Sequence, residues 1–207
     1  MGNIGYTEAG SAGVPLVLLH GVGSDKRVWR PQLEQFAAER QTLAFDYPGY
    51  GESAFQAGAT RDDFARSILE AMDVLGIERA HVCGLSLGGV VAIAMHAAAP
   101  ERCASLILAD TFAVHPEGSA IYERSLAACR ELGMQGLAEA RVDALLAPGT
   151  PAAVREEVIA TMAAIDPAAY ALGAEAVWLA DQRKRAAGVR CPTLILCGSE
   201  DRITPQA

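Results

Sequence analysis

Short apolar runs alternate along this chain with stretches of helical periodicity. The runs cover residues 15–20, 41–46, 80–85, 104–110 and 192–198. They are almost continuously apolar, as is typical of parallel strands that are covered on both faces. Helical patterns follow the first three runs, at residues 28–39, 62–76 and 88–99. This alternation predicts an α/β fold with a mostly parallel, doubly wound sheet.

The alternation is interrupted before the last run, where residues 113–187 show only helical patterns broken by glycine and proline. A segment of this length is too long for a plain loop. Helices inserted after the carboxyl end of a strand lie over the edge where such sheets bind ligands. We therefore expect a core formed by residues 1–112, a helical cap at 113–187, and a further core strand with its following loop at 188–207.

A serine lies between two glycines where the run at 80–85 gives way to a helical pattern. Gly84-Leu85-Ser86-Leu87-Gly88 is a G-x-S-x-G motif, and at a strand-to-helix turn this motif lifts the serine hydroxyl above the sheet as a nucleophile. The amide of Leu87, at the start of the helix, can face a developing oxyanion. The competing interpretation is a dinucleotide-binding fingerprint, but its second glycine is missing here.

Two further motifs follow the first two apolar runs. In His20-Gly21-Val22-Gly23, the amide of Val22 could be the second oxyanion donor. The glycines of Asp46-Tyr47-Pro48-Gly49-Tyr50-Gly51-Glu52-Ser53 suit a tight turn near the floor of the site. For His20 and Asp46 we expect side-chain hydrogen bonds that hold these loops, rather than a direct part in chemistry.

The motifs HGVG, DYPGYGES and GLSLGG, with Gly198-Ser199-Glu200-Asp201 and Thr204-Pro205 near the end, resemble the α/β-hydrolase family over nearly the whole chain. Residues 133–183 resemble the cap of the 3-oxoadipate enol-lactonase branch, which opens a cyclic enol ester. The resemblance implies the α/β-hydrolase fold with an inserted helical cap. It also implies Ser86 as nucleophile, Val22 and Leu87 as oxyanion amides, and Asp201 as the acid that orients a histidine.

Asp110, which ends the run at 104–110, is the rival acid. Its alternative role is a loop hydrogen bond, and the G-x-x-D context favours Asp201. No cofactor is implied, and no His, Cys or Asp cluster has the spacing of a metal site.

The histidine that such a triad requires has no clear candidate. The order in this fold is serine, acid, histidine, yet no histidine follows Asp201 in the 207 residues. His20 and His81 precede Ser86, and we expect His96 to pack or cap within its helix. His115, at the entry to the cap, could approach the site; its alternative is a solvent-facing residue before Pro116.

We therefore expect the last strand and helix of the fold to be missing, with the histidine beyond residue 207. The 207-residue form should then be nearly inactive, because loss of a triad histidine costs on the order of 10⁶-fold in turnover.

These features predict a serine hydrolase of the ester and lactone class, with 3-oxoadipate enol-lactone as the best single substrate candidate. C–C bond hydrolysis and perhydrolase chemistry use the same triad and stay open. The alternative from another class is a non-catalytic protein of this fold that binds a small ligand. Trp29 and Trp178 are candidates to line the pocket, although aromatic residues at helical spacing are more often core.

Composition argues against several partners. A net charge of −8, with Arg183-Lys184-Arg185 as the longest basic cluster, argues against nucleic acid as a partner. That cluster is typical of a solvated helix end.

The five cysteines lack C-x-x-C spacing and are expected to be reduced and structural. The start has no signal-peptide pattern, and the longest apolar stretch is too short to span a bilayer. We expect a cytoplasmic protein with a small-molecule substrate and no membrane partner; the oligomeric state is not defined by the sequence.

Overall fold

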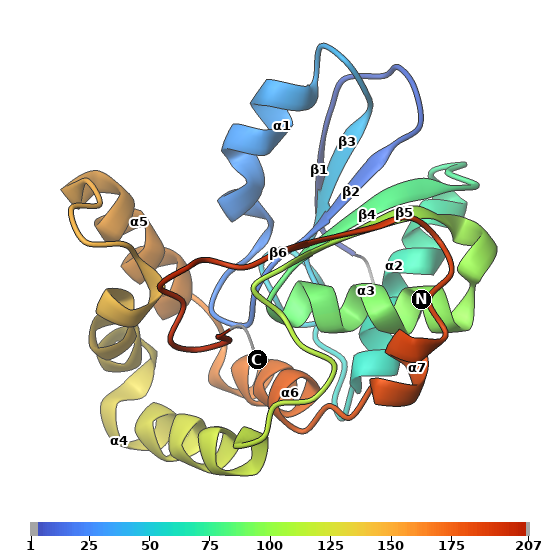
Figure 1. Ribbon diagram of the computed structural model, residues 1–207. Helices are drawn as coiled ribbons and strands as arrows, with labels where there is room; N and C mark the ends of the chain where they lie inside the picture. The colour runs from blue at the N-terminus through green and yellow to red at the C-terminus, as the bar shows by residue number, and fades with distance from the viewer. Residues whose placement is uncertain (1–3, 206–207) are drawn as a thin grey trace.

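The computed structural model describes residues 4–205, which fold around a six-stranded sheet. The strand order is β1-β3-β2-β4-β5-β6 (Figure 1). The strands are β1 (Tyr6–Ala9), β2 (Leu16–Leu19), β3 (Thr42–Phe45), β4 (Ala80–Leu85), β5 (Cys103–Ala109) and β6 (Thr193–Leu196). Strands β2 to β6 run parallel to one another, and β1 pairs antiparallel with β3. The predicted α/β fold with a mostly parallel sheet is confirmed.

Helices cover both faces of the sheet. Successive residues of a strand point to opposite faces, and both sets are apolar in β2. Leu16 and Leu18 of β2 pack with Trp29 and Leu33, which belong to the 3-10 turn Lys26–Trp29 and to α1 (Arg30–Phe36). Val17 and Leu19 face the opposite side, toward α2 (Arg61–Val74) and α3 (Leu87–Ala98). Figure 1 shows α1 on one side of the sheet and α2 and α3 on the other.

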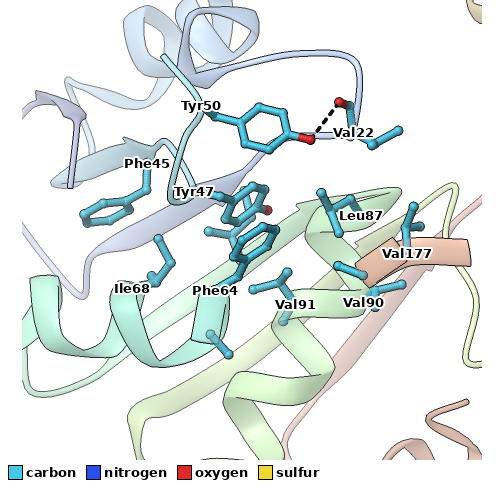
Figure 2. Packing of buried hydrophobic residues seen from close by; sticks show 14 of the residues in the cluster. Val22, Phe45, Tyr47, Tyr50, Phe64, Ile68, Leu87, Val90, Val91 and Val177 are labelled. Carbon is cyan, nitrogen blue, oxygen red and sulfur yellow. Dashed lines mark hydrogen bonds between the residues drawn. The ribbon is translucent and has the colours of Figure 1, made fainter. Parts of the chain in front are cut away.

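The larger core cluster lies between the sheet, α2 and α3. Tyr47 stacks on Phe64 of α2, with ring centroids 5.1 Å apart. Figure 2 shows these rings beside Val90 and Val91 of α3. The start of α2 is fixed by a capping box between Thr60 and Asp63, whose i, i+3 spacing is that of the capping-box motif.

Only helices lie between β5 and β6, apart from an isolated bridge between Val114 and Asp181. They are α4 (Gly118–Leu145), α5 (Ala152–Ala163), α6 (Pro167–Trp178) and α7 (Arg183–Ala187). Figure 1 shows α4, α5 and α6 gathered beyond the carboxyl ends of the parallel strands. A short 3-10 turn, Pro100–Arg102, precedes β5. Within residues 4–205, no helix combines the length and apolar character needed to cross a membrane.

The cysteines are free thiols, as predicted. Cys83 and Cys103 are buried, and burial raises their pKa values to about 11 and about 12 respectively. Both therefore stay protonated at neutral pH and act as small apolar residues.

Candidate active site

Ser86 occupies the sharp turn between β4 and α3 in a strained backbone conformation. Its φ is 53° and its ψ is −113°, a positive φ that is unfavourable for a residue with a Cβ atom and that is concentrated at functional sites. Three contacts hold the turn: the amide of Ser86 donates to Ala109 O (2.9 Å), its carbonyl accepts from the Gly89 amide (2.9 Å), and Thr111 Oγ1 donates to the same carbonyl (2.7 Å). Ser86 itself is half-buried.

The two glycines of the motif are required by close backbone approach. A Cβ atom on Gly84 would lie 2.2 Å from the carbonyl carbon of Gly88. A Cβ atom on Gly88 would lie 2.1 Å from the carbonyl oxygen of Leu19 in β2. The helix can therefore start this close to the sheet only with glycine at both positions.

The loop after β2 runs beside the serine. A Cβ atom on Gly21 would lie 3.7 Å from the Cβ of Ser86. The next residue, Val22, is buried, and its carbonyl accepts from the hydroxyl of Tyr50 at 3.2 Å (Figure 2). Leu87 is the first residue of α3, so its amide has no acceptor within the helix. The predicted oxyanion residues thus flank the serine turn.

His20 holds the loop that contains Val22. Its side chain is buried, and Nδ1 donates to Gly21 O at 2.8 Å. Burial lowers the pKa of His20, so the ring is neutral and structural. The carbonyl of His20 accepts from the Tyr47 hydroxyl at 3.1 Å.

Asp46 ties together the loops after β2 and β3. Its carboxylate accepts from the Lys26 amide (2.8 Å), the Lys26 ammonium (2.6 Å) and the Glu52 amide (3.0 Å). Burial disfavours the charge of Lys26, but the Asp46 and Glu52 carboxylates hold the pKa of Lys26 above its ordinary value. The expectation that His20 and Asp46 hold loops agrees with these contacts. Lys26 was not anticipated, because nothing in its local sequence marks it as buried.

Asp201 follows β6 and is held by its own loop. Its carboxylate accepts from the amides of Ile203 (2.8 Å) and Thr204 (2.9 Å) and from the hydroxyl of Thr204 (2.5 Å). Partial burial opposes the charge, yet the hydrogen bonds from Thr204 and Ile203 lower the pKa of Asp201 below its ordinary value. The group is therefore an anion at neutral pH, as an acid that orients a histidine must be.

The rival acid Asp110 lies in the same place. It follows β5, next to β6 in the sheet, and its Oδ1 accepts from the Gly198 amide at 2.8 Å. The fold also brings Cys197 here: one potential metal-ligand atom from each of Asp110, Cys197 and Asp201 lies within 4.8 Å of the others. The positions of these residues in the sequence do not indicate a metal site, and both carboxylates already accept hydrogen bonds from backbone amides.

The hydrogen bonds of His20, His81 and His115 go to groups other than Ser86. His81 Nδ1 bonds to Ser105 Oγ at 2.7 Å, and His96 is buried in α3. His115 is partly exposed, and its Nε2 lies 3.1 Å from Ile203 O. In the part of the chain that the structure describes, no histidine is hydrogen-bonded to Ser86 Oγ.

The two tryptophans are core residues. Trp29 packs in the smaller cluster on the α1 side of the sheet, and Trp178 is 2% exposed and stacks on Phe112 with centroids 5.7 Å apart. The sequence left open whether Trp29 and Trp178 line a pocket or belong to the core, and both belong to the core.

A serine with positive φ at a strand-to-helix turn of a mostly parallel sheet, with helices on both faces, defines the class of α/β proteins to which this fold belongs. The comparisons identify the family within that class. The family described as alpha/beta hydrolase fold matches residues 14–128, and the chain belongs to this family.

Its relatives include enzymes with several named activities. A protein of Azorhizobium caulinodans that bears the name carbamate hydrolase RutD is 32% identical over 97% of this chain and 78% of its own length. 3-Oxoadipate enol-lactonase 2 of Acinetobacter baylyi is 28% identical over 99% of this chain and 78% of its own. The solved structure of a thermophilic esterase from Thermogutta terrifontis is similar with a TM-score of 0.90 at 28% identity, covering 99% of this chain and 78% of that one. The resemblance to hydrolases, enol-lactonases among them, is confirmed.

Proposed function

We propose that this protein is a cofactor-free serine hydrolase that cleaves a carboxylic ester or lactone. The observation that carries the proposal is the backbone of Ser86, which holds φ at 53° although a relaxed turn would avoid that strain. Ser86 lies at the carboxyl end of β4 and at the start of α3, where the helix dipole favours negative charge, which supports the proposal.

In this proposal Ser86 Oγ attacks the substrate carbonyl, and the amides of Val22 and Leu87 stabilise the tetrahedral oxyanion. A histidine accepts the serine proton and passes it to the leaving alcohol or enol oxygen as the C–O bond breaks. Water then adds to the acyl-enzyme, with the same histidine as base, and releases the carboxylic acid and free Ser86. Asp201 would orient the histidine through its carboxylate.

We place this histidine beyond residue 207. The support is that His20, His81 and His115 are bonded to Gly21, Ser105 and Ile203, and that His96 is buried in α3. The natural polypeptide should therefore exceed the 21.7 kDa of the 207 residues. Its intact mass, measured from the source organism, tests this part directly.

For the substrate we propose 3-oxoadipate enol-lactone, because the similarity to 3-oxoadipate enol-lactonase 2 extends over 99% of the chain. A lactone carbonyl and an open ester carbonyl require the same nucleophile and oxyanion donors. The carbamate named for the Azorhizobium relative is a further acyl substrate to assay.

The test is covalent labelling with a fluorophosphonate, read by intact mass and peptide mapping. Ser86 should be labelled in the natural polypeptide, and Ser86→Ala should abolish both labelling and ester hydrolysis. Ser105 provides a matched control, because it is the serine bonded to a histidine, His81 Nδ1, at 2.7 Å. Ser105→Ala should leave labelling unchanged; labelling at Ser105, or hydrolysis that survives Ser86→Ala, would refute the assignment.

A non-catalytic binding protein is the second candidate, favoured because no histidine of residues 4–205 is hydrogen-bonded to Ser86 Oγ. It predicts a natural polypeptide of 21.7 kDa that binds an enol-lactone by calorimetry and returns it unchanged. For that form, absence of the base should lower turnover by on the order of 10⁶-fold.

A further inference from the structure

Residues 110–115, which we term the bridging segment, connect β5 to the helices that precede β6. Three of their side chains reach parts of the candidate site that are distant in sequence. Thr111 Oγ1 donates to the carbonyl of Ser86, Asp110 Oδ1 accepts from the Gly198 amide, and His115 Nε2 lies 3.1 Å from the carbonyl of Ile203. One short segment thus contacts both the serine turn and the loop that holds Asp201.

The tautomer of His115 follows from its two partners. The Glu117 amide donates to Nδ1 at 3.1 Å, so Nδ1 is an acceptor. The carbonyl of Ile203 can only accept, so Nε2 carries the hydrogen and donates to it. Both contacts are satisfied by one state, the neutral imidazole with its hydrogen on Nε2.

The acceptor of this hydrogen bond belongs to the peptide group that also holds Asp201. The carbonyl of Ile203 and the amide of Thr204 form one planar trans peptide unit, whose C=O and N–H point in opposite directions. On one side His115 donates to the carbonyl, and on the other the Thr204 amide donates to Asp201 Oδ1 at 2.9 Å. A chain of two hydrogen bonds therefore joins His115 to the Asp201 carboxylate, and such chains strengthen one another.

The His115 ring is itself fixed by aromatic packing. It makes edge-to-face contacts with Phe112, at a centroid distance of 5.2 Å, and with Trp178 of α6, at 5.6 Å. Phe112 and Trp178 stack on each other. The Gln182 amide donates to Ala113 O at 2.7 Å, which anchors the bridging segment to the chain leaving α6. The donor at Nε2 is thus pre-positioned by residues of both the bridging segment and α6.

We propose that His115 is a positioning residue that sets the orientation of the Ile203–Thr204 peptide group, and through it the place of the Asp201 carboxylate relative to Ser86. The catalytic consequence rests on the proposed function, whereas the positioning of Asp201 does not. His115 takes no proton from Ser86 in this scheme. Its Nε2–H donates to the carbonyl of Ile203, and the bridging segment contacts both the serine turn and the loop that holds Asp201. It thereby fixes the position of one relative to the other.

The experiment compares three substitutions by residue-resolved hydrogen exchange of the Thr204 amide. His115→Phe keeps the ring packing and removes both hydrogen bonds, so exchange at Thr204 should become about tenfold faster. His115→Gln keeps a donor near the place of Nε2 and should restore most of the protection. His115→Asn is too short to reach Ile203 and should resemble His115→Phe, which keeps the test decisive if the phenylalanine variant does not fold.

Global destabilisation is separated from the local effect by the ratio of Thr204 exchange to that of the Val82 and Leu106 amides in the sheet core. His81→Phe serves as a matched control, since it removes a histidine hydrogen bond at the start of β4 and should leave the Thr204 amide unchanged. Unaltered Thr204 exchange in His115→Phe and His115→Asn, or a glutamine variant as unprotected as the phenylalanine one, would overturn the proposal.

Turnover provides a second, separable result. In the natural hydrolase, His115→Phe should lower kcat about tenfold and leave KM within about twofold, because an interaction that aligns the triad acts on the transition state more than on substrate binding. If the wild-type protein shows no hydrolysis, the proposed function fails and the exchange result alone decides the role of His115. If wild-type hydrolysis is present and exchange at Thr204 is unaltered, the positioning role fails while the hydrolase stands.

Discussion

Backbone strain is concentrated at single residues of the candidate site. Within residues 4–205, two non-glycine residues have positive φ: Ser86 at 53° and Asp110 at 43°. They follow the neighbouring strands β4 and β5. Each such conformation costs of order 1–3 kcal/mol, and the hydrogen bonds from Thr111 to Ser86 O and from the Gly198 amide to Asp110 help to offset it. The site therefore has a stability cost that a serine or aspartate in a relaxed loop would not have.

Replacement of Ser86 measures this cost. Glycine tolerates positive φ, so we expect Ser86→Gly to be more stable than Ser86→Ala by about 1 kcal/mol, measured by urea denaturation. Ser105 in β5 is the control: it is not among the residues with positive φ, so the order should reverse, since glycine within a strand costs roughly 0.5–1 kcal/mol relative to alanine. An alanine variant at position 86 as stable as the glycine variant would show that the turn is not strained.

Among the elements, α4 departs most from regular geometry. It spans Gly118–Leu145 but is interrupted at Gly133, where φ is 66° and ψ is 177°. This region of backbone space is accessible essentially to glycine alone. Met134, Leu137 and Ala138 after the interruption are buried. The interruption therefore redirects the second part of α4 so that these residues can pack.

Gly133→Ala tests whether this geometry is required. A Cβ atom there would meet no atom within 4 Å, so any loss of stability comes from the backbone and not from a clash. We expect a loss of about 1–3 kcal/mol, measured by chemical denaturation. Glu131→Ala, at an exposed position of the same helix, should change stability by less than about 0.5 kcal/mol. Equal stability of the Gly133→Ala variant and the wild type would mean that α4 can straighten without cost.

Local patterns in the sequence predict the elements better than they predict the contacts between them. The capping box of α2 was predictable because Thr60 and Asp63 are three residues apart. Strand β1 was not, because its residues are mostly exposed and it forms by backbone pairing with β3. The contacts of the bridging segment escape local analysis altogether: His115 and Ile203 are 88 positions apart in the sequence, as are Asp110 and Gly198. The serine turn was found from its motif, and the support of Asp201 was not.

For the molecule as a whole, the sheet is unevenly covered. Strands β2 and β3 are buried at all four of their positions, whereas β6 is exposed at all four of its own. Leu194, Ile195 and Leu196 are 52%, 71% and 48% exposed. Within residues 4–205, β6 is also the last strand in the sheet order, with β5 on one side. An edge strand with exposed apolar side chains can pair with another chain.

We expect the 207-residue protein to self-associate through this strand, with a weight-average mass that rises with concentration in analytical ultracentrifugation. Ile195→Lys should suppress the association, because a lysine on an edge strand places a charge where a second strand would pack. Val74→Lys is the control, because Val74 is 81% exposed at the end of α2 and does not belong to the sheet. This substitution also replaces an exposed apolar side chain by lysine. If both lysine variants reduce association equally, general surface hydrophobicity is responsible. If only Ile195→Lys does so, association is specific to the exposed strand β6, and hydrogen exchange of the 207-residue form should then be measured at concentrations where this strand is unpaired.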